Sequence, residues 1–177
     1  GGLDSMVLTD LCVKSGLNIA LAHCNFKLRA QESDGDENFI KDFAQKNHLE
    51  VFTTHFETET FATTTKQSIQ MAARQLRYEW FDTLKYQNGF EYILTAHHAN
   101  DNLETVLINL SRGTGLEGLT GIPELNVSIV RPLLEFSRED IHNFATHHKL
   151  SWREDSSNNS TKYVRNNLRH TIIPLLK

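Results

Sequence analysis

The feature that most restricts the fold of this chain is a regular alternation of short apolar segments with longer amphipathic ones. The apolar runs have the length of buried strands: Asn18 to Cys24, Glu50 to His55 and Tyr92 to Ala96. The segments between and after them carry apolar side chains at helical spacing: Asp34 to Asn47, Ser68 to Tyr86 and Leu103 to Leu110. Strands joined by helical crossovers run parallel. The sequence therefore predicts an α/β fold, a parallel sheet with helices on both faces.

Both ends of the chain add helices to this pattern. The first begins directly after Gly1-Gly2 and ends near Gly16, a residue suited to a helix C-terminus. Two more are predicted near the other end, one from Ser137 to His148 and one leading to Pro174. A parallel α/β domain normally opens with a strand, whereas here the glycine loop comes first. We therefore expect the first strand of the domain to lie outside the chain.

Composition excludes several classes of protein. The chain has 177 residues, of which 39% are hydrophobic and 23% charged, as in a single globular domain. No run approaches the roughly 18 consecutive apolar residues of a membrane span, and the start does not resemble a secretory signal. The two cysteines, Cys12 and Cys24, form no C-x-x-C pair, which argues against disulfides and iron-sulfur or zinc-ribbon sites. We expect a cytoplasmic protein without a membrane partner.

Charge is unevenly distributed along the chain. Its formal net charge is -4. Residues 30–60 carry eight acidic and two basic side chains, whereas residues 149–177 carry six basic and two acidic ones. The acidic segment is interpreted as a solvated surface. For the basic segment, a solvated surface and an anion-binding surface for RNA phosphates are about equally supported by charge alone.

The opening residues, Gly1-Gly2-Leu3-Asp4-Ser5, lead directly into a helix N-terminus, where backbone N–H groups and the helix dipole attract an anion. Glycines allow close approach of a phosphate, and the Ser5 hydroxyl adds a donor. A carboxylate at Asp4 would repel phosphates unless a divalent cation lay between them. Asp4 therefore implies Mg²⁺ beside a phosphate. By itself the segment is a weak signal, because Gly-Gly begins many ordinary turns and the lysine of a Walker loop is absent, so a plain turn is the better interpretation unless other motifs agree.

A second cluster, from His97 to Thr105, follows the predicted strand that ends at Ala96, the position where α/β proteins bind ligands. Asp101 and Glu104 are three residues apart, so on a helix their carboxylates share a face and suit a hard cation. A zinc site that includes His97 is the weaker alternative, because no third histidine or cysteine stands at ligand spacing. Another alternative is that Asn100 or Asp101 merely caps the helix.

Arginines mark two further segments. Arg112 precedes a glycine-rich loop at 113–121 and can clamp a phosphate or a carboxylate; alternatively it is a surface side chain at a helix end. Residues 152–169 bring together aromatic, acidic and donor side chains, including Arg165 and Arg169. Polar loops are common, so this second segment is a weak signal by itself.

Several motifs in order resemble those of the PP-loop, or N-type ATP pyrophosphatase, superfamily, whose signature is SGGxDS. Within it, the chain resembles the tRNA(Ile)-lysidine synthetase family. The matching segments span essentially the whole chain: GGLDS at 1–5, HCNFKLR at 23–29, ARQLRY at 73–78, AHHANDNLET at 96–105, RGTG at 112–115, RPLL at 131–134, and the region from 152 to 169. One departure is Phe26, which stands where the family has a second histidine in H-x-N-H.

The resemblance implies an enzyme that uses ATP, and Mg²⁺ held by Asp4, Asp101 and Glu104, to adenylate the wobble cytidine of tRNA(Ile) with a CAU anticodon. The ε-amine of free L-lysine then attacks C2 of that cytidine and AMP leaves, so the enzyme is a carbon–nitrogen ligase. Arg112 is expected to stabilise phosphate charge in catalysis. Residues 1–130 would form the catalytic domain and 131–177 its C-terminal helical part, with further tRNA-binding domains outside the chain. Whether two copies form a homodimer is open.

The expected ligand contacts follow from the same motifs. The nucleotide-binding residues are expected to be Gly1, Gly2, Leu3, Asp4, Ser5, His23 and Asn25. The substrate-binding residues are expected to be Arg74, Arg77, His97, Arg165 and Arg169. Arg74 or Arg77 would accept the lysine carboxylate, or else pair with Glu79 on the helix surface. His23 is a candidate to stack on the extruded base.

Alternative functions differ in what else they require. A tRNA thiolase of the same superfamily usually carries C-x-x-C sulfur chemistry, which this sequence lacks. An amide-forming synthetase needs an ammonia source, and no glutaminase domain is visible. A non-catalytic nucleotide-binding module of related fold would not need Asp4, Asp101 and Glu104 to converge on a metal.

Overall fold

The computed structural model describes residues 1–29, 31–154 and 168–173, and within these the chain forms two compact units. The first unit comprises Gly1 and Leu11–Ile93, and the second comprises Gly2–Asp10 and Leu94 onward. Helix α1 (Leu3–Lys14) contributes its first turns to the second unit and its last turn to the first. It ends as expected near Gly16, whose φ of 70° is in the left-handed region that favours glycine.

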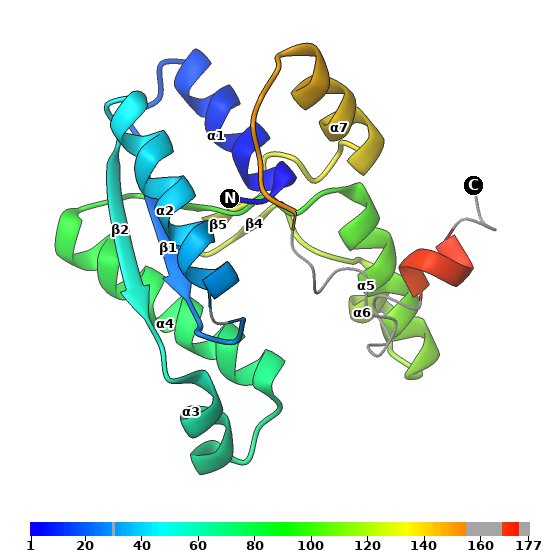
Figure 1. Ribbon diagram of the computed structural model, residues 1–177. Coiled ribbons are helices and arrows are strands. Elements are labelled where there is room, and N and C mark those ends of the chain that lie inside the picture. Colours follow the sequence, from blue (N-terminus) through cyan, green and yellow to red (C-terminus); the bar gives the residue numbers. More distant parts are fainter. Residues whose placement is uncertain (30, 155–167, 174–177) are drawn as a thin grey trace. The chain divides into compact units, whose positions relative to one another are not determined.

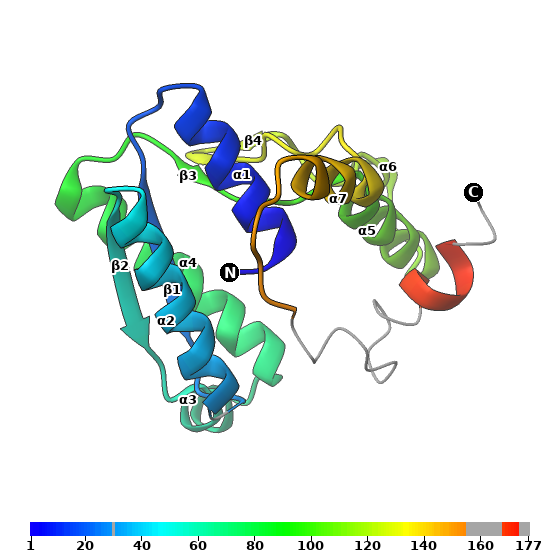
Figure 2. The ribbon, with the colours of Figure 1, turned by 45° about the horizontal axis from the view of Figure 1, so that its top comes forward.

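The first unit contains the parallel strands that the alternation predicts. Strands β1 (Ala20–Asn25) and β2 (Glu50–His55) pair in parallel from Ala20 opposite Glu50 to Asn25 opposite His55. The crossover between them is helix α2 (Gln31–Lys46), which packs on one face of both strands, while helix α4 (Ile69–Asn88) lies behind them (Figures 1 and 2). The α/β fold class, with helices on both faces of a parallel sheet, is therefore confirmed.

Local capping sets the bounds of α4. The Ser68 hydroxyl accepts a hydrogen bond from the backbone N–H of Met71, and Gly89 ends the helix with a φ of 70°. Helix α3 (Thr58–Thr65), which precedes α4, is a difference from the sequence expectation. Its sequence, TETFATTT, is rich in β-branched threonine, which has low helix propensity, and so it carries little helical signal.

The other sheet has three short strands in the order β3-β5-β4 and lies mainly in the second unit. Strand β3 (Ile93–Leu94) is shorter than predicted, and β4 (Leu125–Asn126) and β5 (Ile129–Val130) form an antiparallel hairpin that the sequence pattern did not indicate. The helices of this unit, apart from the start of α1, are α5 (Ala99–Ser111), α6 (Leu116–Leu119), α7 (Arg138–His147) and the π-helix η2 (Leu168–Ile172). The described strands thus fall into two sheets.

Each unit has its own buried apolar side chains. Those of the first unit are Cys12, Ile40, Ala44, Ala62 and Ala72. Those of the second unit are Leu3, Met6, Val7, Leu8, Leu133, Leu134, Ile141, Ala145 and Ile173. Among the helices that the structure describes, none is long and apolar enough to cross a membrane. The functional boundary expected at residue 130 remains a prediction.

Candidate active site

The start of α1 has the form expected for an anion-binding helix N-terminus. Leu3 is buried and fixes the first turn, while Gly2 and Ser5 are exposed. A side chain added at Gly2 would meet no atom within 4 Å, so open space lies beside this backbone. The backbone N–H groups of a first helical turn have no partner within the helix. A phosphate could therefore approach these groups closely.

Helix α5 presents a second polar helix start in the same unit, organised by His98. The ring Nδ1 of His98 accepts a hydrogen bond from the backbone N–H of Asp101 at 3.3 Å. In return, the Asp101 carboxylate accepts from the backbone N–H of His98 at 3.1 Å. The two residues form a reciprocal capping box in which His98 is the N-cap and Asp101 the third helical residue. Asp101 thus takes part in capping, as one alternative expected, but the N-cap is neither Asn100 nor Asp101.

The same imidazole links α5 to α1. Since Nδ1 accepts a hydrogen bond, the proton of the neutral ring is assigned to Nε2. That atom lies 3.9 Å from the Oδ1 of Asp4. His98 is 1% exposed, so water does not compete for this position. His98 thus lies between two of the three expected metal ligands, and the sequence analysis did not include it among the site residues.

The three expected metal ligands differ in exposure. Glu104 is fully buried at 0%, whereas the side chains of Asp4 and Asp101 are 30% and 17% exposed. Across residues 1–29, 31–154 and 168–173, no three His, Cys, Asp or Glu side chains form a ready metal site. Mg²⁺ in nucleotide enzymes typically takes one or two carboxylates together with substrate phosphates and water. A cation here would therefore need further ligands from a nucleotide or water, and the metal role of the three residues remains a proposal.

The remaining polar residues of the His97–Thr105 motif hold neighbouring segments. The Asn100 side chain accepts from the backbone N–H of Arg138, at the start of α7, at 2.9 Å. The Asn102 side chain accepts from the backbone N–H of Ile122 at 2.7 Å. His97 contacts the Thr95 hydroxyl through its Nδ1 at 3.0 Å. Two motif residues are thus structural, and the expected substrate contact of His97 stays a prediction.

Arg112 stands at the end of α5 beside the glycine-rich loop. Its backbone N–H caps the helix on Asn109 and Leu110, and its side chain is exposed. The loop after it is held to α5, because the Asn109 amide donates to the carbonyl of Gly118 at 2.8 Å. The guanidinium is therefore carried by an anchored backbone and remains accessible to a ligand.

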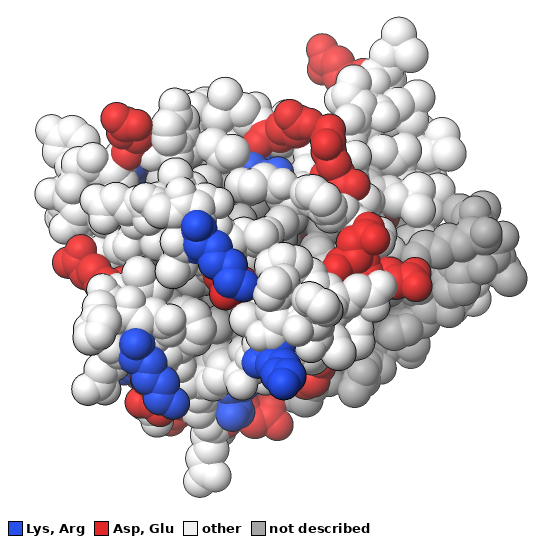
Figure 3. Space-filling model, turned by 90° about the horizontal axis from the view of Figure 1, so that it is seen from above, with Lys and Arg blue, Asp and Glu red and all other residues white. Residues whose placement is uncertain are grey.

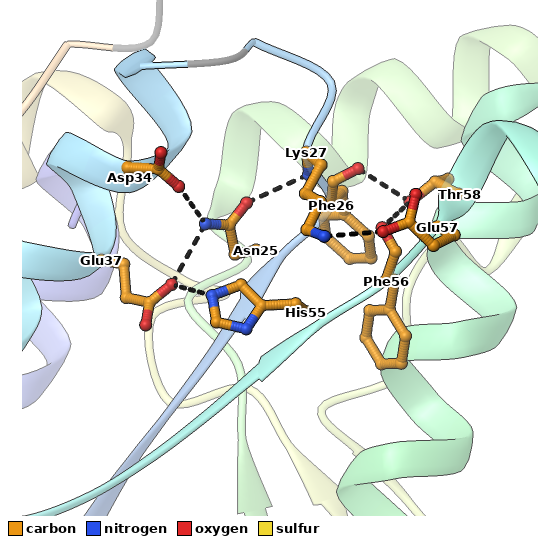
Figure 4. A network of polar contacts seen from close by, with 9 residues as sticks. All are labelled: Asn25, Phe26, Lys27, Asp34, Glu37, His55, Phe56, Glu57 and Thr58. Carbon is orange, nitrogen blue, oxygen red and sulfur yellow. Dashed lines mark hydrogen bonds and ion pairs between the residues drawn. The ribbon is translucent and has the colours of Figure 1, made fainter.

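In the first unit, Asn25 lies at the centre of a buried polar network (Figure 4). Its amide donates to Asp34 at 3.0 Å and to Glu37 at 3.1 Å, and its oxygen accepts from the backbone N–H of Lys27 at 3.0 Å. Asn25 is 1% exposed. These bonds tie the end of β1 to α2, so the structure assigns the amide a structural role. Its expected contact with a nucleotide remains a prediction.

The Glu37 carboxylate has several hydrogen-bond partners in this network, including Asn25. The carboxylate also accepts from Lys41 at 2.6 Å and lies 2.7 Å from Nε2 of His55. Burial by itself raises the pKa of Glu37, but the hydrogen bonds from Lys41, Asn25 and His55 outweigh burial and lower the pKa to about 2. Glu37 is therefore ionised throughout the physiological pH range. The sequence predicts a solvated surface for this acidic segment, whereas Glu37 itself is buried.

Burial lowers the pKa of His23 to about 4. The ring is therefore neutral at pH 7. Its Nε2 is buried and has no hydrogen-bond partner within the described part of the chain. A buried polar atom of this kind suits a ligand hydrogen bond. This observation supports the expectation that His23 contacts the nucleotide or the base.

The two arginines of α4 each lie over an aromatic ring. The guanidinium of Arg74 is 4.8 Å from the ring centre of Tyr78, and that of Arg77 is 5.2 Å from the ring centre of Phe26. Glu79 accepts instead from Gln75 at 2.8 Å, so the alternative pairing with Glu79 is absent among the described residues. Both side chains are exposed, which leaves them accessible to an oxyanion.

Two expected substrate residues fall outside the described side chains. Arg165 lies in the segment 155–167, which the structure does not describe, and Arg169 is described only through the backbone of η2. On the face shown in Figure 3, basic side chains are separated by acidic and uncharged ones. The RNA role of the basic C-terminal segment stays a prediction.

Comparison with known proteins agrees with the sequence motifs. Residues 1–176 match a family described as the PP-loop domain. Over the whole chain, the sequence is 44% identical to a tRNA(Ile)-lysidine synthase of Porphyromonas gingivalis, 42% identical to one of Bacteroides thetaiotaomicron and 40% identical to one of Chlorobaculum tepidum. The chain spans 39%, 42% and 55% of the length of these three curated relatives.

A solved structure shows the same fold. The chain resembles the U34-tRNA thiolase NcsA from Methanococcus maripaludis, which was solved with its [4Fe-4S] cluster, with a TM-score of 0.77. The likeness covers 95% of this chain and 61% of that one. At 15% identity, it supports the shared architecture alone.

Proposed function

The chain belongs to the PP-loop domain family, and from this membership we propose that it is the ATP-using catalytic part of a tRNA(Ile)-lysidine synthase. The observation that carries the proposal is identity of 35% to 44% across the entire chain to curated tRNA(Ile)-lysidine synthases from several bacteria. Because the chain spans only part of those relatives, the activity of the whole protein is part of the proposal. Residues 1–130 would form its catalytic domain and residues 131–177 the helical part of that domain.

The proposed reaction has two steps. In the first, O2 of the wobble cytidine in the CAU anticodon attacks the α-phosphate of ATP, and pyrophosphate leaves. In the second, the ε-amine of free L-lysine attacks C2 of the adenylated base and loses a proton, and AMP leaves with the C2 oxygen. The enzyme is thus a ligase that forms a carbon–nitrogen bond at the expense of one ATP. We propose that it meets its tRNA in the cytoplasm.

The residues of the second unit have the properties that the first step needs. We propose that the backbone and hydroxyl of Gly2–Ser5 bind phosphate oxygens at the start of α1. Mg²⁺ would be held by Asp4, Asp101 and Glu104 together with the phosphates, and it would neutralise charge on them. We propose that the His98 ring, whose Nε2 lies 3.9 Å from the Oδ1 of Asp4, helps to orient Asp4 for this role. Arg112 would stabilise the charge that develops as pyrophosphate leaves.

The residues of the first unit would serve the nucleotide and the second step. We propose Gly1, His23 and Asn25 as nucleotide-binding residues, with the unsatisfied Nε2 of His23 as support. Arg74 or Arg77 would bind the lysine carboxylate, because a guanidinium matches a carboxylate in charge and geometry.

His97, Arg165 and Arg169 are proposed to contact the RNA. A thiolase function is less well supported, since Cys12 is buried and the sequence holds no C-x-x-C pair. Homodimer formation is a question for solution measurements.

The proposal is tested by product analysis on the full-length protein. With ATP, Mg²⁺, lysine and tRNA(Ile) present together, AMP and pyrophosphate should form in equal amounts. Omission of tRNA should stop both products. AMP formation at the same rate without tRNA would contradict the proposal.

A further inference from the structure

Arg77 is held by side chains that come from the end of β1. Phe26 directly follows β1, and its ring lies 5.2 Å from the guanidinium carbon of Arg77. The Phe26 ring is itself stacked on Phe56, which follows β2, with ring centres 5.6 Å apart (Figure 4). The aromatic support of Arg77 is therefore fixed to two neighbouring parallel strands.

A second contact reaches the same guanidinium. Burial raises the pKa of the Cys24 thiol to about 11, and the nearby Arg77 guanidinium acts in the opposite direction, so the two side chains are neighbours. Cys24 and Phe26 are two residues apart, so an extended chain presents both on one side, opposite to the buried Asn25. The guanidinium has five N–H donors. Among the described residues it forms no ion pair with an acid, which leaves donors for a ligand.

Arg74 offers a comparison on the same helix. Its ring partner is Tyr78, which lies four residues further along α4 at 4.8 Å. That contact holds Arg74 only relative to its own helix. The contacts of Arg77 hold it relative to the strands, at the edge of the sheet where α/β proteins bind ligands. Of these two arginines, Arg77 is the one whose aromatic contact among the described residues comes from outside its helix.

From these contacts we propose that Phe26 is a positioning residue, which holds the Arg77 guanidinium in the geometry that binds an oxyanion of a substrate. This inference rests on the proposed function. The oxyanion is either the carboxylate of the amino acid or a phosphate of the nucleotide or RNA, since a guanidinium binds both.

The departure of Phe26 from the family's histidine has a physical consequence. A phenyl ring cannot be protonated, so its face attracts the guanidinium at every pH. A histidine at this position would lose that attraction once its ring carried a positive charge. In this chain the support of Arg77 is therefore independent of pH.

The test compares three variants of the full-length protein: Phe26→Leu, Phe26→Tyr and Tyr78→Leu. KM and kcat are measured for lysine, ATP and tRNA in turn, and equilibrium binding of each substrate is measured alongside. Loss of an exposed cation–π contact should raise one KM about two- to five-fold in Phe26→Leu, with kcat nearly unchanged. Phe26→Tyr retains the aromatic face and should restore the original KM. Tyr78→Leu, the matched control, should leave KM unchanged.

The substrate that responds identifies the oxyanion. A higher KM for lysine alone indicates that Arg77 binds the lysine carboxylate. A higher KM for ATP or tRNA indicates that it binds a phosphate. Unchanged KM and binding in Phe26→Leu, or an equal effect of Tyr78→Leu, would overturn the inference. If the wild-type protein incorporates no lysine, the proposed function fails, and the binding measurements still decide whether Phe26 positions Arg77.

Discussion

The Nε2 of His98 lies 3.9 Å from the Oδ1 of Asp4, so a buried imidazole at the start of one helix faces a carboxylate in the first turn of another. The other ring nitrogen accepts from the backbone of Asp101. The His98 side chain therefore lies near both helix starts, those of α1 and α5, that the motifs predict to be catalytic. The arrangement resembles the outer support that orients ligands in metal sites.

Two substitutions of His98 should distinguish the effect of its contact with Asp4 from the effect of its hydrogen bond to the Asp101 backbone. His98→Asn retains an acceptor suited to the helix cap, whereas His98→Ala loses the cap as well. Both variants should lose most pyrophosphate release, because Asp4 is no longer oriented. Only the alanine variant should also lose about 1 kcal/mol of stability in urea unfolding relative to asparagine. Full activity in His98→Asn would show that the Asp4 contact has no catalytic role.

Substitution of the expected metal ligands should abolish adenylation without unfolding the protein. Asp4→Asn and Glu104→Gln preserve side-chain size but remove the charge that a cation requires. Pyrophosphate release should fall below detection in both, while circular dichroism stays unchanged. Glu117→Gln, on exposed α6, is the matched control and should be fully active. Retained pyrophosphate release in a folded Asp4 or Glu104 variant would refute the metal role.

Stability should depend on pH through Glu37. Its native pKa of about 2 lies below its ordinary value of 4.5, so the unfolded state binds the proton more readily. The contribution of Glu37 is complete above pH 4.5 and is lost as pH falls towards 2. Urea midpoints between pH 5 and pH 3 should therefore fall more steeply in the wild type than in Glu37→Gln. The same slope in both proteins would contradict this assignment, and Glu32→Gln on the same helix serves as the control.

The pKa of His23 should be far below that of an ordinary histidine. Its native pKa is about 4, against an ordinary 6.5, because burial disfavours the charged ring. The unfolded state therefore gains its proton first, and the contribution of His23 to stability declines as pH falls from 6.5 towards 4. NMR titration of the ring should give a midpoint near 4 in the folded protein. A midpoint near that of the urea-unfolded chain would show that the ring is solvated.

The fold could be predicted from the sequence where periodicity was strong. The strand at 50–55 matches β2 at both ends, and the long helix begins at Ile69, one residue after its predicted start. Helix α3 and the hairpin of β4 and β5 carried no such signal. The threonines of α3 have low helix propensity, and a two-residue strand is too short for alternation to be seen.

The sequence indicated which types of residue belong to the candidate site, but it did not indicate which of them contact one another. Spacing on α5 indicated Asp101 and Glu104, but it gave no sign that His98 would face Asp4, which lies far away in the sequence. The network of Asn25 and Glu37 was missed for the same reason, because α2 brings Glu37 to the end of β1 only in the folded chain. Glu37, which belongs to an acidic segment, is buried in the folded chain and has a structural role there.

The proposal that the protein attaches lysine to the wobble cytidine of tRNA(Ile) can be tested by incorporation of radiolabelled lysine into RNA. The measurement uses the full-length protein with ATP and Mg²⁺ present. One tRNA carries the CAU anticodon, and a matched tRNA differs only by uridine at the wobble position. We expect label in the first RNA and none in the second. Equal labelling of both RNAs, or none in either, would contradict it.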